Sequence, residues 1–200
     1  MTLPPAPPLR ICVYCGSRHG RLPAYTEAAR ALGRAIGSRG WQLVYGGGHV
    51  GLMGEVADAT LAAGGTVVGV ITEALMQREV GHRGLTELHV VPSMHARKQM
   101  MAERADLFIA LPGGIGTMEE LYEVWTWRQL GHHERPIGLV NVAGFYDGFL
   151  RFVQQMVAEG FLAQTQAASL ASHHDPEQLL LELAQRARVL PAGRDDFERN

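Results

Sequence analysis

The chain has only one lysine and two cysteines among its 200 residues, and its acidic and basic residues almost balance. With a formal net charge of −2, it offers no basic surface along which a nucleic acid could bind. No apolar run approaches the ~20 residues that span a bilayer. We therefore expect no nucleic-acid and no membrane partner.

The N-terminal segment 1–8 is rich in proline and lacks the charged and apolar regions of a signal peptide. We expect it to be a disordered or polyproline lead-in to a single domain over residues 9–190. Residues 191–200 are polar and predict a frayed tail. The simplest location for such a chain is the cytoplasm.

The two cysteines, Cys12 and Cys15, form a C-x-x-C pair inside an apolar run, without a second pair to complete a zinc site. We interpret them as two small strand side chains. The pairs His132-His133 and His173-His174 are adjacent in sequence and lack metal-ligand spacing, which indicates surface or helix-end groups. No metal is predicted.

Apolar, β-rich runs alternate with amphipathic helical patterns throughout the chain. The strands are expected at Leu9–Cys15, Trp41–Tyr45, Thr66–Ile71, Leu85–Val91, Asp106–Leu111 and Pro136–Val142. The helices are expected at 23–39, 51–63, 94–105, 117–130, 145–159 and 175–189. This alternation predicts an α/β fold with a parallel sheet covered on both faces. The segment 72–85 looks irregular and predicts a rim or lid.

Three of these strands run directly into loops of glycine and hydroxyl residues, at 16–20, 46–51 and 112–117. The carboxyl ends of parallel strands share one edge of the sheet, where ligands bind. Glycines let backbone N–H groups converge, and a helix N-terminus adds about half a positive charge. Together the loops predict a pocket for a phosphate-bearing ligand.

The segment Gly46-x-Gly48-x-x-Gly51 also fits the dinucleotide fingerprint, with Glu73 near the place of the ribose-binding acid. Two points count against an NAD site: the motif follows the second strand, and two other loops compete for the same edge. The alternatives are a tight turn that lets the following helix pack closely, or close approach of a mononucleotide.

Thr117-x-x-Glu120 is also a capping box, so a capping role for Glu120 and a catalytic one are both open. Glu119 lies ~100° further around the same helix, and the two carboxylates cannot face one ligand atom. Met94, Arg97 and Met101 are spaced so that they share one face of a helix. It is either a solvated arginine or a cation aimed at the same sheet edge.

Met94-x-x-Arg97-Lys98, followed by Pro112-Gly113-Gly114-x-Gly116-Thr117-x-x-Glu120, resembles the signature of the LOG ("Lonely Guy") family. These are cytokinin riboside 5′-monophosphate phosphoribohydrolases, whose bacterial members often carry a "lysine decarboxylase" label. The resemblance extends over about residues 10–185 and includes Cys15-Gly16-Ser17, the 44–54 segment, Glu79-Val80 and the 125–131 segment.

The resemblance implies a Rossmann-like, doubly wound fold and a homodimer that hydrolyses the N-glycosidic bond of a nucleoside 5′-monophosphate without a cofactor. Arg97 and Glu120 match the family's catalytic pair. The substrate- and phosphate-binding positions would be Ser17, Gly47, Glu79, Lys98, Gly113, Gly114, Ile115, Gly116, Thr117, Met118, Glu119 and Thr126. Arg18 departs from the pattern, since many members have a second serine there.

Three other expectations follow. A pyridoxal enzyme needs a Schiff-base lysine, and the single lysine, Lys98, lies beside Arg97 in the substrate motif, so a decarboxylase is not supported. A non-catalytic nucleotide carrier or sensor of the same fold is the alternative function. Trp125 and Trp127 lie on opposite sides of their helix, which suggests one for the core and one for an interface.

Overall fold

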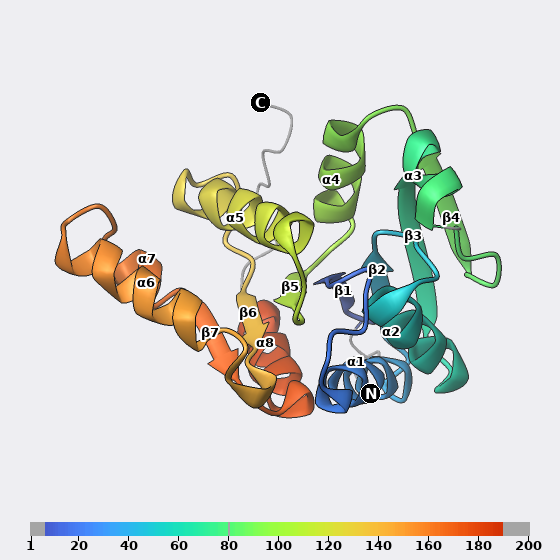
Figure 1. The fold of residues 1–200 in the computed structure, drawn as a ribbon, viewed down its shortest axis with the longest axis horizontal. Helices are drawn as coiled ribbons and strands as arrows, with labels where there is room; N and C mark the ends of the chain where they lie inside the picture. Colours follow the sequence, from blue (N-terminus) through green and yellow to red (C-terminus); the bar gives the residue numbers. More distant parts are fainter. Residues whose placement is uncertain (1–6, 80, 190–200) are drawn as a thin grey trace, which may run out of the picture.

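The computed structural model describes residues 7–79 and 81–189 and consists of one α/β domain (Figure 1). Its seven-stranded sheet has the order β4-β3-β2-β1-β5-β6-β7, and every neighbouring pair is parallel. The strands are β1 (Arg10–Tyr14), β2 (Gln42–Tyr45), β3 (Thr66–Thr72), β4 (Glu87–Val91), β5 (Leu107–Ala110), β6 (Ile137–Val140) and β7 (Leu170–His173).

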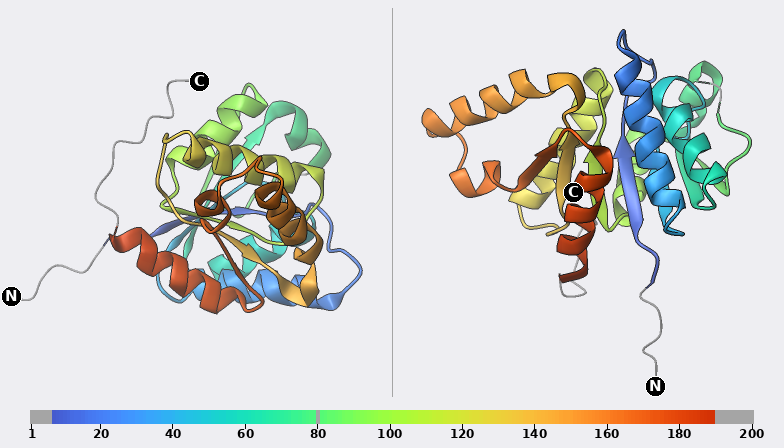
Figure 2. Two further views of the ribbon diagram at one scale, coloured as in Figure 1. Left: turned by 90° about the vertical axis from the view of Figure 1, so that its left-hand side faces the viewer. Right: turned by 90° about the horizontal axis from the view of Figure 1, so that it is seen from below.

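Each face of the sheet carries its own layer of helices, because alternate residues of each buried strand point to opposite sides. Ile11 and Val13 belong to one apolar cluster, whereas Cys12 and Tyr14 belong to the other. The first cluster is covered by α1 (Pro23–Gly37), α2 (Gly51–Ala62) and α8 (Pro176–Val189). The second is covered by α4 (Met94–Glu103), α5 (Ile115–Gln129), α6 (Asp147–Ala158) and the short α7 (Gln164–Ala167), as Figure 2 also shows.

The strand order reverses direction at the neighbouring pair β1 and β5. Ligands of doubly wound sheets bind in the crevice at such a switch point, outside the carboxyl ends of the strands. The loops that leave β1 and β5 therefore stand on either side of the expected binding crevice. The backbone of Gly16 donates to the carbonyl of Pro112 at 3.1 Å and joins the two loops directly.

The predicted doubly wound fold is confirmed, and all six predicted strands and six predicted helices are present to within two residues at each end. The prediction missed β7 and the helix α3 (Glu73–Glu79), as well as α7 and the 3-10 turn η1 (Val142–Gly144). The strand β7 has the sequence Leu-Ala-Ser-His and so lacks the continuous apolar run that marks the predicted strands. The helix α3 is only seven residues long and ends in the polar residues Gln-Arg-Glu. The predicted lead-in and tail fall almost entirely outside the described residues.

Three side chains differ from their predicted environments. His133 is buried, and its ring nitrogens pair with the carbonyl of Val124 and the N–H of Arg135, so the surface assignment was wrong. Trp125 and Trp127 are both buried in the same cluster, so neither is available to an interface.

Across residues 7–79 and 81–189, no helix is long and apolar enough to cross a membrane.

Candidate active site

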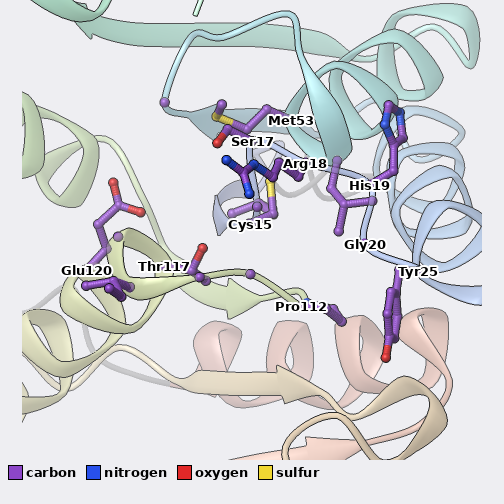
Figure 3. Close-up of a pocket in the computed structure, with 18 of the residues that line it drawn as sticks. Cys15, Ser17, Arg18, His19, Gly20, Tyr25, Met53, Pro112, Thr117 and Glu120 are labelled. Atoms are coloured by element: carbon purple, nitrogen blue, oxygen red, sulfur yellow. The ribbon is translucent and has the colours of Figure 1, made fainter. Parts of the chain in front are cut away.

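A pocket of about 610 Å³ opens at the switch point, between the loop after β1 and the loop that joins β5 to α5 (Figure 3). Its walls also receive residues from the start of α1, the loop after β2, α2 and α4. The side chains of Thr117 and Glu120 enter from α5, and Arg97 enters from α4. Segments far apart in the sequence thus meet at one place.

The N-terminus of α5 forms one wall of this pocket. Gly114 is the N-cap residue and Met118 makes the first backbone bond of the helix, to the carbonyl of Gly114. The N–H groups of the first helical residues lack intrahelical acceptors, which creates an anion site at the positive end of the helix. Thr117 is the third residue of the helix, so the capping-box interpretation of Thr117 and Glu120 was wrong.

Gly113 is required for this geometry, because a Cβ there would collide with the hydroxyl of Thr117 and crowd the backbone of Gly16. Because Gly113 has no Cβ, the side chain of Thr117, which is buried in the pocket wall, can lie against the backbone of the loop. The loop can therefore offer converging N–H groups and one hydroxyl to a phosphate.

Arg97 and Glu120 form a nearly buried ion pair in the pocket wall. Nη1 of Arg97 lies 3.2 Å from Oε1 of Glu120, and the two side chains are 7% and 10% exposed. The guanidinium is also held by two carbonyls, since Nε donates to Val70 at 3.0 Å and Nη2 to Gly46 at 3.5 Å. Arg97 is therefore not a solvated surface arginine, and that interpretation was wrong.

Lys98 faces away from the pocket. Its ammonium group lies 15% exposed between Glu119, at 2.5 Å, and Glu123, at 3.0 Å, and so ties α4 to α5. Although burial opposes it, these two carboxylates raise the pKa of Lys98 above its ordinary value. The ion pairs fix the two helices that supply Arg97 and Glu120.

The structure brings most of the predicted site residues together. Those that line the pocket are Ser17, Arg97, Gly113, Gly114, Ile115, Gly116, Thr117 and Glu120. Gly47, Lys98, Met118, Glu119 and Thr126 do not line it. Glu79 ends α3, and its side chain lies outside the described part of the chain.

The wall also has an apolar part that was not predicted, to which Cys15, Met53, Tyr25 and Phe145 contribute. The rings of Tyr25 and Phe145 meet edge to face, with centroids 5.7 Å apart, although the two residues are 120 positions apart in the sequence. No motif surrounds either of them, so no local signal could have assigned them to the site.

The interpretation of the C-x-x-C pair as strand side chains is confirmed. Neither cysteine forms a disulfide, and both are buried in different apolar clusters on opposite faces of the sheet. Burial holds the pKa of the Cys12 thiol well above its ordinary value. A thiol that stays protonated is a poor nucleophile and a poor metal ligand.

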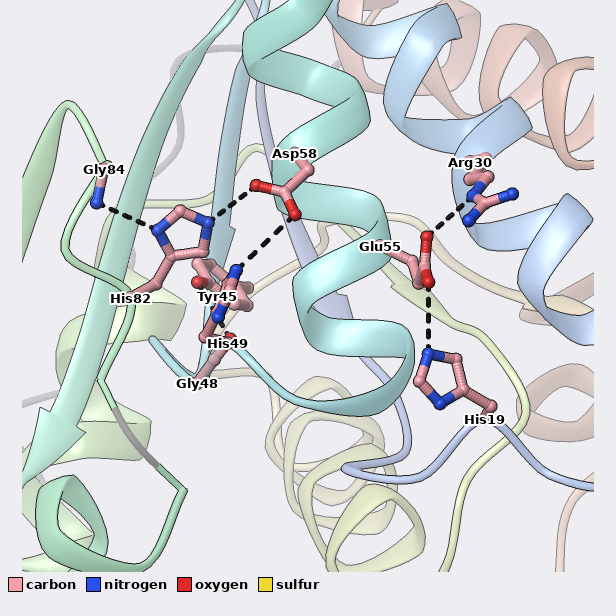
Figure 4. A network of polar contacts seen from close by, with 9 residues as sticks. All are labelled: His19, Arg30, Tyr45, Gly48, His49, Glu55, Asp58, His82 and Gly84. Atoms are coloured by element: carbon pink, nitrogen blue, oxygen red, sulfur yellow. Dashed lines mark hydrogen bonds and ion pairs between the residues drawn. The ribbon is translucent and has the colours of Figure 1, made fainter.

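One donor set that the sequence analysis did not identify is the cluster His49, Asp58 and His82, whose ligand atoms all lie within 4.8 Å of one another (Figure 4). Asp58 lies 2.9 Å from Nε2 of His82 and 3.7 Å from Nε2 of His49. Because Gly84 donates its N–H to Nδ1 of His82 at 3.1 Å, the neutral ring carries its proton on Nε2. In that tautomer Nε2 of His82 donates to Oδ1 of Asp58.

The chain is similar in sequence to known proteins. The family described as "Possible lysine decarboxylase" matches residues 53–183. The cytokinin riboside 5′-monophosphate phosphoribohydrolase LOG of Oryza sativa subsp. japonica is 52% identical over 174 residues, which cover 87% of this chain and 72% of the rice protein. The phosphoribohydrolase LOG7 of Arabidopsis thaliana is 48% identical over 174 residues, covering 87% and 80%.

Solved structures with much lower identity share the fold. The molybdenum cofactor carrier protein of Chlamydomonas reinhardtii is 20% identical, with a TM-score of 0.68 over 90% of this chain and 98% of that chain. The molybdenum cofactor binding protein of Rippkaea orientalis is 19% identical, with a TM-score of 0.66 over 92% and 99%. At this identity the similarity extends to the fold alone.

Proposed function

The chain belongs to the LOG family of cytokinin riboside 5′-monophosphate phosphoribohydrolases, and from that premise we propose that it hydrolyses the N-glycosidic bond of adenosine 5′-monophosphates, including N6-modified ones. Water adds to C1′ of the ribose, and the base departs with the bonding electron pair and takes up a proton. The products are the free base and ribose 5-phosphate.

The observation that carries this proposal is the placement of the Arg97–Glu120 pair beside the N-terminus of α5, in one pocket. A helix N-terminus binds a phosphate. A protein that only binds a nucleotide does not need a nearly buried ion pair next to that cradle. The pocket therefore combines a binding end and a reacting end.

The transition state of the reaction resembles an oxocarbenium ion, with negative charge moving to the base. The carboxylate of Glu120 is suited to stabilise that cation, orient the attacking water or hold the ribose hydroxyls. The guanidinium of Arg97 can offset the charge on the departing base or position the ring. The loop from Gly113 to Thr117 fixes the 5′-phosphate, and this remote binding energy orients the reacting centre.

The test is a base-release assay on the purified protein, with AMP, isopentenyladenosine monophosphate, adenosine and NAD compared by chromatography. We expect free base only from the two monophosphates and none from them with Glu120→Gln. Base release that persists in this variant would contradict the catalytic assignment. Release from no substrate, with retained nucleotide binding, would favour the carrier or sensor.

Lysine decarboxylation, which the family description mentions, has less support. The only lysine of the chain, Lys98, is engaged by Glu119 and Glu123 and points away from the pocket. A Schiff base requires a neutral amine, and these carboxylates favour the charged form. The glycine segment 46–51 forms hydrogen bonds with Arg97 and with the neighbouring loops. It therefore has a structural role that does not require NAD.

The proposal includes a homodimer, which the family resemblance implies. Large apolar side chains stand exposed on the second layer, including Tyr122 of α5, Leu130 at the C-cap of α5 and Phe152 of α6. Such a surface supports association with a second copy. Light scattering on the purified protein tests it, and a monomeric mass would contradict it.

A further inference from the structure

The loop after β1 places one more charged side chain in the pocket than the family signature accounts for. Among the pocket-lining residues of the described chain, the arginine, histidine and acidic side chains are Arg18, His19, Arg97 and Glu120. Arg97 pairs with Glu120, and His19 pairs with Glu55. Arg18 is exposed and makes no side-chain hydrogen bond or ion pair with the described residues.

The backbone that carries Arg18 is held on two sides. The preceding Gly16 donates to Pro112 at 3.1 Å, and its carbonyl accepts from Leu52 at 3.0 Å. Gly51, whose φ is +61°, packs so tightly on the backbone of Ser17 and Arg18 that any side chain there would collide with it. The position of Arg18 relative to the phosphate cradle is thus fixed by contacts with both neighbouring loops.

From this fixed backbone the side chain enters the cavity. Figure 3 shows the guanidinium of Arg18 directed into the pocket, on the side of Thr117 and away from the ring of His19. His19 turns outward to Glu55, which also binds Arg30 at 2.7 Å (Figure 4). The neighbouring carboxylate is therefore already engaged and does not draw Arg18 away from the pocket.

We propose that Arg18 is a phosphate-binding residue that contacts the 5′-phosphate of the substrate opposite the N-terminus of α5. A phosphate monoester carries a charge of about −1.5 to −2 at neutral pH. The Arg97–Glu120 pair contributes no net charge, and the helix terminus contributes only about half a unit. A guanidinium adds a full positive charge and a planar fork of donors that matches two phosphate oxygens.

This inference deepens the proposed function, on which it rests, because it assigns the ligand of Arg18 as the phosphate group of the proposed substrate. The competing explanation is a solvated arginine at the pocket rim. The two explanations predict different effects on phosphate binding when the charge of Arg18 is removed. A solvated arginine can be removed without effect on phosphate binding, whereas a phosphate ligand cannot.

The test measures binding of ribose 5-phosphate by calorimetry to the wild-type protein and three variants. Arg18→Gln removes the charge, and Arg18→Lys keeps the charge but not the fork. Arg21→Gln removes the same charge three residues away, from an exposed side chain outside the pocket wall, and is the matched control. Ribose and inorganic phosphate serve as comparison ligands.

We expect Arg18→Gln to raise the Kd for ribose 5-phosphate by about 10- to 100-fold, the range of one charge-assisted contact. Arg18→Lys should fall between Arg18→Gln and the wild type, and Arg21→Gln should stay within about twofold of the wild type. In turnover, Arg18→Gln should raise KM for AMP more than it lowers kcat. Equal Kd values for Arg18→Gln and the wild type would overturn the proposal.

Failure of this proposal and failure of the proposed function give different results. If the wild type releases base from AMP and Arg18→Gln binds ribose 5-phosphate normally, the hydrolase stands and the assignment of Arg18 falls. If the wild type binds ribose 5-phosphate in an Arg18-dependent manner but releases no base, the assignment stands and the hydrolase falls.

Discussion

Arg97 on α4 and Glu120 on α5 face each other across the pocket wall at 3.2 Å, although 22 residues separate them in the sequence. Neither helix alone could keep its charged side chain so nearly buried. The guanidinium is fixed by carbonyls of Val70 and Gly46, and it holds the carboxylate of Glu120 in the wall of the same pocket as the N-terminus of α5. The relationship is the centre of the site, and most of the predictions below depend on it.

The first prediction concerns activity. Glu120→Gln conserves the shape of the side chain and removes its charge, so it should lower kcat for AMP hydrolysis by at least about 100-fold, the contribution of one positioned catalytic group. Circular dichroism should show an unchanged fold. Retained kcat would contradict a catalytic role, and the chromatographic base-release assay measures it directly.

The second prediction concerns stability. Arg97→Ala removes the ion-pair partner of the nearly buried Glu120 carboxylate, which should cost about 3 kcal/mol or more and lower Tm by several degrees. Replacing both residues, as Arg97→Met with Glu120→Leu, should recover most of that loss without restoring activity. Thermal melts of Arg97→Met, Glu120→Leu and the double variant close the cycle. Additive losses would contradict a coupled pair.

The third prediction concerns the substrate's phosphate. Adenosine lacks the phosphate that we propose the N-terminus of α5 binds, so kcat/KM should fall by about 100-fold or more relative to AMP. Loss of at least two charge-assisted hydrogen bonds, each worth about 1.5–3 kcal/mol, accounts for this magnitude. Initial rates with both substrates at equal enzyme concentration measure the ratio. Similar rates would show that the cradle does not contribute to turnover.

The fourth prediction uses a glycine that touches the reacting end of the site. A Cβ at Gly46 would collide with Nη2 of Arg97, so Gly46→Ala should displace the guanidinium and lower kcat by about 10-fold or more. Gly148→Ala is the matched control, because a Cβ in α6 meets nothing closer than 3.8 Å. Its activity should equal that of the wild type, and its Tm should be equal or higher.

Part of this site could be predicted from the sequence alone. The glycine loops could be assigned to one edge of the sheet because alternation and strand direction are local signals. The partner of Glu120 could not be assigned from spacing, since the capping box Thr117-x-x-Glu120 satisfied a local rule equally well. Only the structure, which begins α5 at Ile115 and turns Glu120 toward Arg97, separates the two interpretations.

Side-chain environment was the least predictable feature. His133 follows another histidine near a helix end, a pattern typical of a surface, yet the turn after α5 returns its ring to the core beside Phe108. Trp125 and Trp127 differ by two positions on α5, and both are buried in the same cluster. Trp125 is covered by Phe149 of α6 and donates to the carbonyl of Gln166 in α7. Such packing depends on elements that come later in the chain.

The last prediction decides the role of Lys98, which the family resemblance implies is a substrate contact. In the structure its ammonium joins Glu119 and Glu123, so Lys98→Met should lower stability by about 1 kcal/mol and Tm by about 2–4 °C. A substrate contact predicts instead a raised KM with an unchanged Tm. Thermal melts and AMP kinetics on the same preparation distinguish the two.

The pH dependence of that loss has a definite sign. Burial works against the charged amine, but the two carboxylates raise its folded-state pKa above the ordinary 10.5. The stabilisation is therefore complete below that ordinary value and is lost as the pH rises through the folded-state pKa. The Tm difference between wild type and Lys98→Met should stay constant from pH 7 to 9 and shrink above about pH 10.5. A difference that grows toward alkaline pH would show that the ion pairs are not its source.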